Sequence, residues 1–502
     1  MATTVLQLGG DNNWAKTCQL SSDLKWHFND FLSNKLAWYS VVILTGRVDF
    51  PDQLWEELLW SSTPYSVFYQ AGLKEQLSPA ARRFLKLTVA KQFHETPQKM
   101  AELIERKYFF GQTGIRLRPN DLVIDERHFH ELDFPDGGHL RLMVNSQNWE
   151  AIGSYRQALY VDPHRQLKLW LEAQHDSSVA VRLVAYPLDN NDQGKYYYFP
   201  VNAEDRELVV PTPITTNPQF ITIGVQARGH GHLKLGMFHY RWARYGAGEY
   251  IAGGHRLINP ANNEEVAYYF NPGDMKPPLN VYFAGARSME GFEAYPLFRN
   301  LHAPSLLFTD PRLEVGQFYT GDYIEAGVRR VIRQTLIKLG FTTADLITAG
   351  TSMGSYAALR FGAQLGAHGI FVRKEIANLG YVASRSRFDR PDEFEAAFDI
   401  DAQLIDHQSP TTLKQLDRQF WMDLNATDLS KTRLFMVYMK NDDYDNHAIH
   451  DLLKSPAIAQ SRQFVYQGYR GHHNDETEDV INWFVFRIRQ MMRTDFGRKE
   501  PV

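Results

Sequence analysis

Three groups of residues in the C-terminal half could together carry out acyl transfer. Ser352 lies in Gly350-Thr351-Ser352-Met353-Gly354, which fits the pattern G-x-S-x-G. Aspartates occur at 442, 443 and 445, and two histidines at 472 and 473. A serine that attacks an acyl carbon needs an imidazole to take its proton and a carboxylate to orient that imidazole. The three groups therefore predict a serine acyl-enzyme.

The elements around Ser352 favour this interpretation. The apolar run 346–349 has strand character, and Tyr356, Ala357, Phe361 and Leu365 recur at helical spacing after the motif. A strand, a tight turn and a helix in this order form the nucleophile elbow of α/β-hydrolases. A glycine-serine turn before a buried helix would give the same short motif, so the assignment depends on the other two groups.

Both other groups follow predicted strands, at 434–439 and 463–466. In α/β-hydrolases the acid and the histidine come after the serine, in that order. We favour Asp442 as the acid because it is the first carboxylate after its strand, with Asp443 and Asp445 as alternatives. We favour His472 as the base because Gly471 permits a tight approach, and this leaves His473 as a substrate contact.

An oxyanion hole needs two N–H groups that point at the developing charge. The Met353 N–H comes from the elbow itself. The second should come from the loop after the strand at 279–283, at Ala286 or at Gly285. Arg287 in the same loop either binds substrate or closes the loop through an ion pair. We expect no metal site, because His230 and His232 have no His or Cys partner at ligand spacing.

The composition indicates a soluble globular protein. Of 502 residues, 44% are hydrophobic and 22% charged, and the net charge of -4 gives no electrostatic basis for nucleic-acid binding. The single cysteine, Cys18, suits a reducing compartment. The N-terminus lacks the pattern of a signal peptide, and no apolar run approaches the length of a transmembrane segment. We therefore expect a cytoplasmic location.

The periodicity of the sequence predicts three domains. Residues 1–112 read as an N-terminal α/β domain, residues 113–262 as a β-sandwich, and residues 263–502 as an α/β-hydrolase-like catalytic domain. After the elbow helix, the next strand is expected near 374–377. Aromatic runs such as Tyr196-Tyr197-Tyr198-Phe199 make the sandwich similar to carbohydrate-binding domains, although alternate residues of any sandwich strand fill its core.

The sequence resembles the second accessory secretory protein of the accessory Sec system. The resemblance rests on VYFAGAR at 281–287 with EGFE at 290–293, on AGTSMGSYAA at 349–358, and on YMK with DDYD at 438–445. It implies an O-acetyltransferase that acts on N-acetylglucosamine of serine-rich repeat glycoprotein adhesins. It also implies an export role, in a complex with two other accessory Sec proteins and the accessory SecA motor, at the membrane translocase. By motif position, Ser352, Asp442 and His472 would be nucleophile, acid and base.

The residues alone leave three functions open. The first is sugar O-acetyltransfer, the second is an esterase or deacetylase with the same triad, and the third is a non-catalytic scaffold of a secretion complex. We expect no resident cofactor. The acyl donor is not indicated by the sequence, and acetyl-CoA is the candidate.

Overall fold

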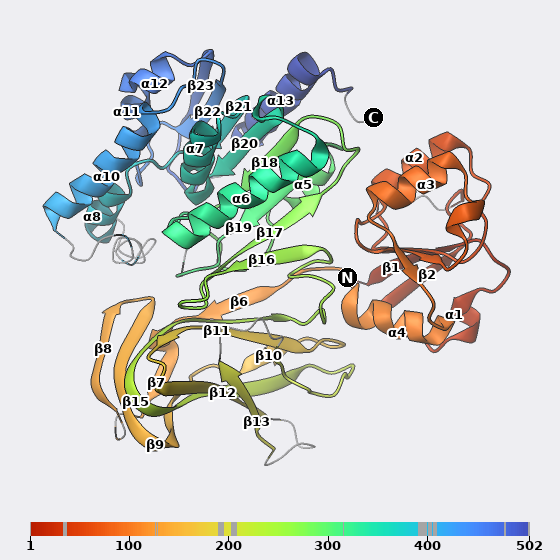
Figure 1. The fold of residues 1–502 in the computed structure, drawn as a ribbon, viewed down its shortest axis with the longest axis horizontal. Coiled ribbons are helices and arrows are strands. Elements are labelled where there is room, and N and C mark those ends of the chain that lie inside the picture. The colour runs from red at the N-terminus through yellow and green to blue at the C-terminus, as the bar shows by residue number, and fades with distance from the viewer. Residues whose placement is uncertain are drawn as a thin grey trace.

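A computed structural model describes residues 2–499, apart from 34–37, 126, 128, 189–194, 202–207, 315, 390–398, 400–403, 405–408 and 476–477. The fold is mixed α/β, and its sheets follow one another along the chain (Figure 1). The helices that the structure describes include none with the length and apolar character needed to cross a bilayer.

The first sheet is parallel and has the order β2-β1-β3-β4-β5. Its strands are β1 (Thr3–Leu8), β2 (Leu24–Phe28), β3 (Val41–Leu44), β4 (Val67–Gln70) and β5 (Lys91–Phe93). Helices α1 (Trp14–Thr17), α2 (Asp52–Ser61) and α3 (Pro79–Leu87) lie between strands, and α4 (Pro97–Lys107) follows β5. Sheets of this order usually bind ligands at the crevice between β1 and β3. Here a Cβ on Gly9 would lie 2.4 Å from the Gly46 carbonyl oxygen, so the two loops pack together in that crevice.

The second sheet is antiparallel. Its strands are β6 (Gly114–Leu117), β7 (Leu122–Ile124), β8 (His130–Asp136), β9 (His139–Tyr155), β10 (Leu159–Val161), β11 (Leu167–His175), β12 (Val179–Pro187), β13 (Tyr197–Val201), β14 (Leu208–Val209) and β15 (Gln219–Trp242). Alternate residues of β12 are buried, as expected for a strand with one face on a core. The long strand β15 pairs with β6, β9, β10, β11 and β12. The expected sandwich is therefore one continuous sheet folded around a single apolar core.

The third sheet has the order β16-β17-β19-β18-β20-β21-β22-β23 and is parallel from β19 to β23. Its strands are β16 (Gly254–Ile258), β17 (Glu265–Asn271), β18 (Leu279–Phe283), β19 (Ser305–Thr309), β20 (Leu346–Thr351), β21 (Gly369–Arg373), β22 (Arg433–Met439) and β23 (Gln463–Tyr469). The sheet starts before the expected boundary at 263, because β16 pairs with β17. The strand expected near 374–377 lies earlier, at β21.

Helices cover both faces of the third sheet (Figure 1). They are α5 (Tyr295–Arg299), α6 (Asp322–Leu339), α7 (Met353–Leu365), α8 (Leu379–Asp389), α10 (Pro410–Asn425), α11 (Ala448–Lys454), α12 (Pro456–Ala459) and α13 (Glu478–Phe496). Apolar residues of α6 and α7 pack on one face, and those of α5 and α13 on the other. Parallel strands need this arrangement because both sides of the sheet must be covered.

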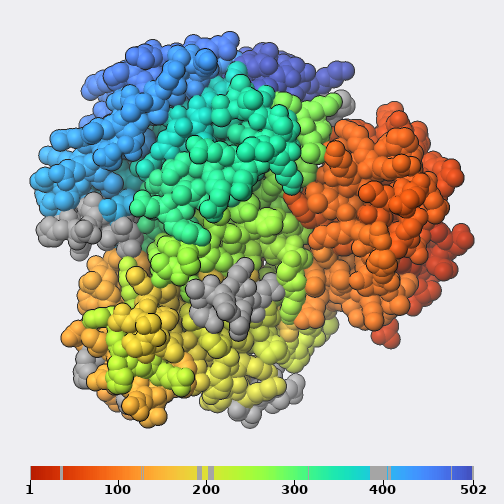
Figure 2. Space-filling model, in the orientation of Figure 1, coloured from red at the N-terminus to blue at the C-terminus, as the bar shows by residue number. Residues whose placement is uncertain are grey.

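The three sheet regions contact one another, as the space-filling view shows (Figure 2). Between the second and third sheets lies a buried network of charges. Arg241 on β15 binds Glu265 on β17, and the Arg256 Nη1 atom lies 2.8 Å from the Glu265 Oε2 atom. Burial opposes ionisation of Glu265, but Arg241 and Arg256 outweigh it and lower its pKa to about 2. The charges of this interface therefore neutralise one another.

Removing one member of this network should destabilise the protein strongly. We expect Glu265→Gln to lower the apparent unfolding temperature by about 10 °C at pH 7, because two arginines stay buried with less negative charge. Glu264→Gln, at a less buried neighbouring carboxylate, is the control and should shift it little. The pKa of Glu265 is lowered from 4.5 to about 2. The stabilisation that its charge gives the folded state is therefore complete above pH 4.5 and is lost as the pH falls toward 2. The difference between variant and wild type should shrink over this pH range in thermal denaturation, and equal unfolding temperatures at pH 7 would contradict the prediction.

Candidate active site

Ser352 occupies a strained turn between β20 and α7. Its backbone has φ 52° and ψ −120°, a conformation that L-residues rarely adopt. A Cβ on Gly350 would lie 2.0 Å from the Gly354 carbonyl oxygen, and a Cβ on Gly354 would lie 2.0 Å from that of Phe283. Both positions therefore require glycine, and the strand, turn and helix form the predicted elbow.

A chain of hydrogen bonds links Ser352 to an acid. The Ser352 Oγ atom lies 2.8 Å from the His473 Nε2 atom, and the His473 Nδ1 atom lies 2.8 Å from the Asp442 Oδ2 atom. Burial opposes ionisation of Asp442, but hydrogen bonds from His473 and from the Tyr444 and Asp445 amides keep its pKa below the ordinary value. Asp442 is therefore a carboxylate at neutral pH, and it can orient the imidazole and stabilise its protonated form.

The structure corrects the choice between the two histidines. The His473 side chain is 2% exposed and points at Ser352, whereas the His472 side chain is 63% exposed. The His472 Nδ1 atom lies 3.5 Å from the Asp443 Oδ2 atom, and the His472 amide donates to Asp475. The turn after Gly471 directs these adjacent side chains in different directions. The prediction of His472 as base and His473 as a substrate contact is therefore wrong for this geometry.

The other aspartates of the loop have different positions. Asp443 accepts a hydrogen bond from the His473 amide at 2.9 Å and so fixes the backbone at the base. Asp445 accepts from the amides of Ala377 and Asn378 at 2.8 and 2.7 Å, which ties its loop to the segment after β21. Asp442 is thus the carboxylate that contacts the imidazole.

Sequence reasoning missed one neighbour of the base. The Tyr444 ring stacks on the His473 imidazole with ring centroids 4.3 Å apart and an interplanar angle of 13°. The Asn474 Nδ2 atom donates to the Tyr444 hydroxyl at 3.1 Å. Tyr444 thus covers one face of the imidazole, and its place two residues after Asp442 in the sequence is a signal that could have suggested it.

The expected oxyanion donors lie next to the serine. Met353 is the first residue of α7, where backbone N–H groups lack partners within the helix and the helix dipole favours negative charge. The Gly285 N–H donates to a Glu293 carboxylate oxygen at 3.2 Å. Because that N–H is occupied, Ala286 is the better candidate for the second donor.

A pocket with a volume of about 430 Å³ opens at Ser352 and His473. Ala286 and Arg287 line it, as expected, but so do residues that the sequence analysis did not select: Ser288, Glu293, Glu314, Arg373, Lys374 and Asn474. The Arg373 Nε atom donates to the Thr351 hydroxyl at 3.0 Å, so this cation is held beside the elbow. Charges of both signs on the walls suit a polar substrate.

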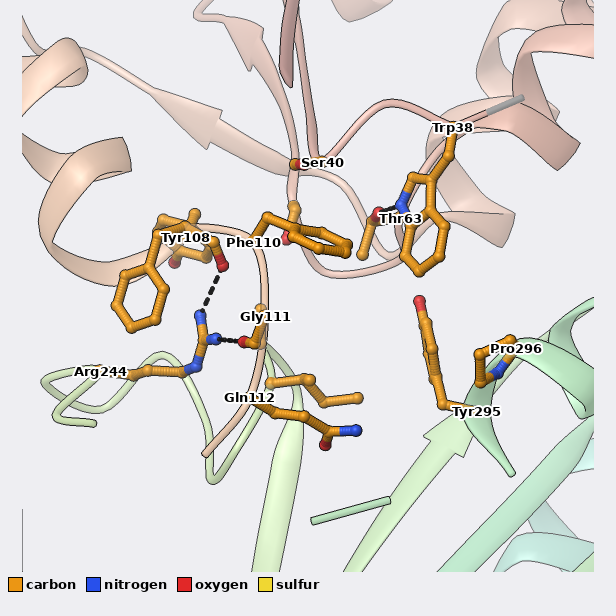
Figure 3. Close-up of a pocket in the computed structure, with 14 residues that line it drawn as sticks. Trp38, Ser40, Thr63, Tyr108, Phe110, Gly111, Gln112, Arg244, Tyr295 and Pro296 are labelled. Carbon is orange, nitrogen blue, oxygen red and sulfur yellow. Dashed lines mark hydrogen bonds between the residues drawn. The ribbon is translucent and has the colours of Figure 1, made fainter. Parts of the chain in front are cut away.

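A second cavity, of about 180 Å³, lies where the three regions meet (Figure 3). Its lining is mainly apolar and includes Trp38, Phe110 and Tyr295. Arg244 borders it and donates to the carbonyl oxygens of Phe109 and Gly111. None of the described residues that line this second cavity belongs to the hydrogen-bonded set Ser352, His473 and Asp442. The polar pocket at Ser352 is therefore the candidate site for chemistry.

Comparison with known proteins gives a consistent match along the whole chain. Residues 3–498 match the family described as accessory Sec system GspB-transporter. An accessory Sec system protein of Streptococcus gordonii is 32% identical over 514 residues, covering 99% of each chain. A namesake in Staphylococcus aureus (strain NCTC 8325 / PS 47) is 32% identical over 511 residues, covering 98% of this chain and 97% of that protein.

A solved structure agrees with these matches. A chain of the "Glycosylation Associate Protein (Gap123) complex from Streptococcus agalactiae" has a TM-score of 0.84 and 30% identity, with 99% of both chains covered. The family match and these relatives extend over nearly all residues rather than one region. The chain therefore belongs to the family of accessory Sec system GspB-transporter proteins.

Proposed function

We propose that this protein is an O-acetyltransferase with a serine nucleophile, which modifies N-acetylglucosamine on serine-rich repeat glycoprotein adhesins. The observation that carries the proposal is the hydrogen-bonded chain of Ser352, His473 and Asp442. Family membership supports an adhesin of the accessory Sec system as the substrate. The similar Streptococcus agalactiae chain comes from a glycosylation-associated complex, which supports a glycoprotein as the substrate.

The arrangement of elements supports an α/β-hydrolase-like catalytic region. Ser352 follows β20, Asp442 follows β22 and His473 follows β23, and these strands belong to the parallel part of one sheet. Their carboxyl ends meet at one edge, which brings distant residues together. The chain order of serine, acid and histidine is that of α/β-hydrolases.

The chemistry would take two steps. His473 takes the proton of Ser352 as its oxygen attacks the acyl carbon, and the N–H groups of Met353 and Ala286 stabilise the oxyanion. The carbon–oxygen or carbon–sulfur bond of the donor breaks, and His473 protonates the leaving group. A sugar hydroxyl then attacks the acyl-serine, His473 accepts its proton, and Ser352 leaves with a proton from His473.

Acetyl-CoA is the acyl donor that we propose, and it would enter as a substrate rather than as a bound cofactor. The cationic residues Arg287, Arg373 and Lys374 line the pocket, and such side chains can bind the phosphates of a donor of this kind. Water in place of the sugar hydroxyl would make the same site an esterase or deacetylase.

Mass spectrometry of the adhesin glycans, with and without this protein, tests the proposal. We expect acetylated N-acetylglucosamine only when the protein is present and Ser352 is intact. Fewer acetyl groups in the presence of the protein would instead indicate the deacetylase, and glycans of equal mass would contradict both enzymatic functions.

We further propose an export role in a complex at the cytoplasmic side of the translocase. The partners would be other accessory Sec proteins, the accessory SecA motor and the adhesin. The family description and the complexed Streptococcus agalactiae relative support this role. Ser352, Asp442 and His473 all lie in the region of the third sheet. The first two sheet regions are therefore free to provide surfaces for partners.

These two roles should separate in one variant. Ser352→Ala removes one oxygen from a turn whose backbone is fixed by glycines, so surfaces elsewhere should not change. We expect the variant to copurify with its accessory Sec partners in wild-type amounts and to support adhesin export, measured by pull-down and by surface adhesin levels. Loss of the complex from a folded variant would show that the two roles depend on each other.

A further inference from the structure

The loop that carries the proposed oxyanion donor is held from outside by the second sheet. We name residues 285–294, which include Ala286, the oxyanion loop. The Gln112 side chain binds the backbone of Phe292 on both sides: its Nε2 atom donates to the Phe292 oxygen at 3.0 Å, and its Oε1 atom accepts from the Phe292 N–H at 2.9 Å. The Glu290 N–H donates to the Gly114 oxygen at 2.8 Å. The segment at 112–118 therefore lies along the loop.

Two glycines leave room for the side chains that make this contact. A Cβ on Gly114 would lie 2.7 Å from the Glu290 Oε2 atom. Gly291 has φ 133°, and a Cβ there would lie 2.9 Å from the Gln112 Oε1 atom. A side chain at either position would displace Glu290 or Gln112, the two side chains that join the segments, so the contact depends on the sequence of both.

The middle of the oxyanion loop is fixed by a buried ionic anchor at Glu290. The Glu290 Oε1 atom lies 2.6 Å from the His239 Nδ1 atom, and its Oε2 atom accepts from the Tyr250 hydroxyl at 2.7 Å. The side chains of His239 and Glu290 are fully buried. Burial opposes ionisation of Glu290, but His239 and Arg241 outweigh it and lower its pKa to about 2. The anchor thus consists of opposite charges that stabilise each other.

Arg116 makes the contact that reaches the pocket. It lies on β6, and its guanidinium donates to the carbonyl oxygens of Arg287 and Glu314. Its Nε atom also donates to the Glu314 oxygen, at 2.9 Å. Arg287 and Glu314 both line the pocket at Ser352, and they come from different loops. One side chain of the second sheet therefore joins two walls of the candidate active site.

We propose that Arg116 is a positioning residue for acyl transfer. By binding the carbonyl of Arg287, it fixes the Arg287–Ser288 peptide, the second peptide unit after the one that carries the Ala286 N–H. It thereby restricts movement of the loop that aims this N–H at the oxyanion. Arg116 acts through the loop and does not touch the reacting atoms. This inference rests on the proposed function, and it assigns the second sheet a part in the reaction in addition to any binding of partners.

The guanidinium suits this role because it is planar and donates several hydrogen bonds in fixed directions. Without it, two loop carbonyls lose a shared donor and the oxyanion loop can move relative to Ser352. A displacement of about 1 Å in an active site can lower the rate about 100-fold. The lost stabilisation should affect the transition state rather than substrate binding, because the oxyanion forms only after the acyl carbon is attacked.

The test is the hydrolysis of p-nitrophenyl acetate by the full chain, with kcat and KM measured separately. We expect Arg116→Ala to lower kcat by about 10-fold to 100-fold and to change KM by less than about twofold. Arg116→Lys should recover part of the loss, because an ammonium can still bind a carbonyl. The pH at half-maximal kcat/KM should not change, because His473 and Asp442 are intact.

A matched control lies two residues away. The Arg118 Nη1 atom lies 3.1 Å from the Glu314 Oε2 atom, and both side chains are more than a third exposed. Arg118→Ala removes the same charge from the same segment, and the described bond that it loses is to the Glu314 side chain rather than to a loop carbonyl, so kcat should stay within about threefold of the wild-type value. If Arg116→Ala does not fold, Arg116→Lys supplies the test: its ammonium cannot reproduce the bonds of the planar guanidinium to both loop carbonyls, so kcat should still fall.

The outcomes separate this inference from the proposed function. A wild-type protein that neither turns over the ester nor reacts with a fluorophosphonate probe would overturn the function itself. Wild-type reactivity with an unchanged kcat in folded Arg116→Ala would overturn only the positioning role. A similar fall of kcat in Arg116→Ala and in Arg118→Ala would also overturn the positioning role, and so would a shifted pH profile of kcat/KM. Either result would indicate a general disturbance of the site.

Discussion

Ser352→Ala is expected to lose all covalent reaction with a fluorophosphonate probe. The Ser352 Oγ atom is the nucleophile in the proposed reaction, and its distance of 2.8 Å from the His473 Nε2 atom allows the proton to leave as the new bond forms. Loss of the nucleophile in a serine triad lowers kcat by about 10⁶-fold. We therefore expect ester turnover by Ser352→Ala to fall at least about 10⁴-fold, measured with p-nitrophenyl acetate.

The fold of this variant should remain intact, because the backbone at 352 is set by Gly350 and Gly354. We expect the free energy of unfolding to change by at most about 1 kcal/mol. Ser384→Ala is the control: the Ser384 hydroxyl is exposed on α8 and binds only the nearby Tyr381 oxygen among the contacts described, so labelling should stay at the wild-type level. Undiminished labelling of Ser352→Ala would end the assignment of the nucleophile.

His473→Ala is expected to lose nearly as much activity as Ser352→Ala. His473 is the side chain that contacts both Ser352 and Asp442, so its removal leaves the serine without a base and the carboxylate without its partner. We expect ester turnover to fall at least about 10³-fold and probe labelling to slow by a similar factor.

His472→Ala is the natural control, since it removes an imidazole from the adjacent residue. Its side chain is 63% exposed and contacts Asp443 rather than Ser352, so kcat should change by less than about threefold. Measuring kcat in His472→Ala and in His473→Ala therefore decides which histidine is the base. A larger loss in His472→Ala than in His473→Ala would restore the choice that the sequence favoured.

The sequence predicted much of the site because its signals are local. Gly350 is required by a contact with Gly354, four residues away, and the strand and helix on either side of Ser352 are apolar. Gly354 is required by the distant Phe283 carbonyl, but it is recognised through its place in the motif. Asp442 is the first carboxylate after β22, which was enough to select it. These features depend on backbone sterics and on the strand ends, and both can be read from short segments.

Other features depend on segments far apart in the chain. The strand expected near 374–377 lies at β21, because Gly366 ends α7 early and the apolar run from Gly369 pairs with β20 and β22. β16 lies in the region expected to belong to the sandwich, yet it pairs with β17 across a short turn. Pairing partners decide such strands, and periodicity does not show them.

By itself, the sequence predicted that a serine, an acid and a histidine stand at one edge of a parallel sheet, and the structure places Ser352, Asp442 and His473 there. The tertiary structure decided which histidine contacts Ser352, because neighbouring side chains point in different directions and only the fold shows which direction faces the serine. It also decided that Glu293 occupies the Gly285 N–H and that Arg116, about 170 residues before the oxyanion loop in sequence, holds its carbonyl. Hydrogen bonds between distant segments depend on distances of a few tenths of an ångström, which no local pattern of residues specifies.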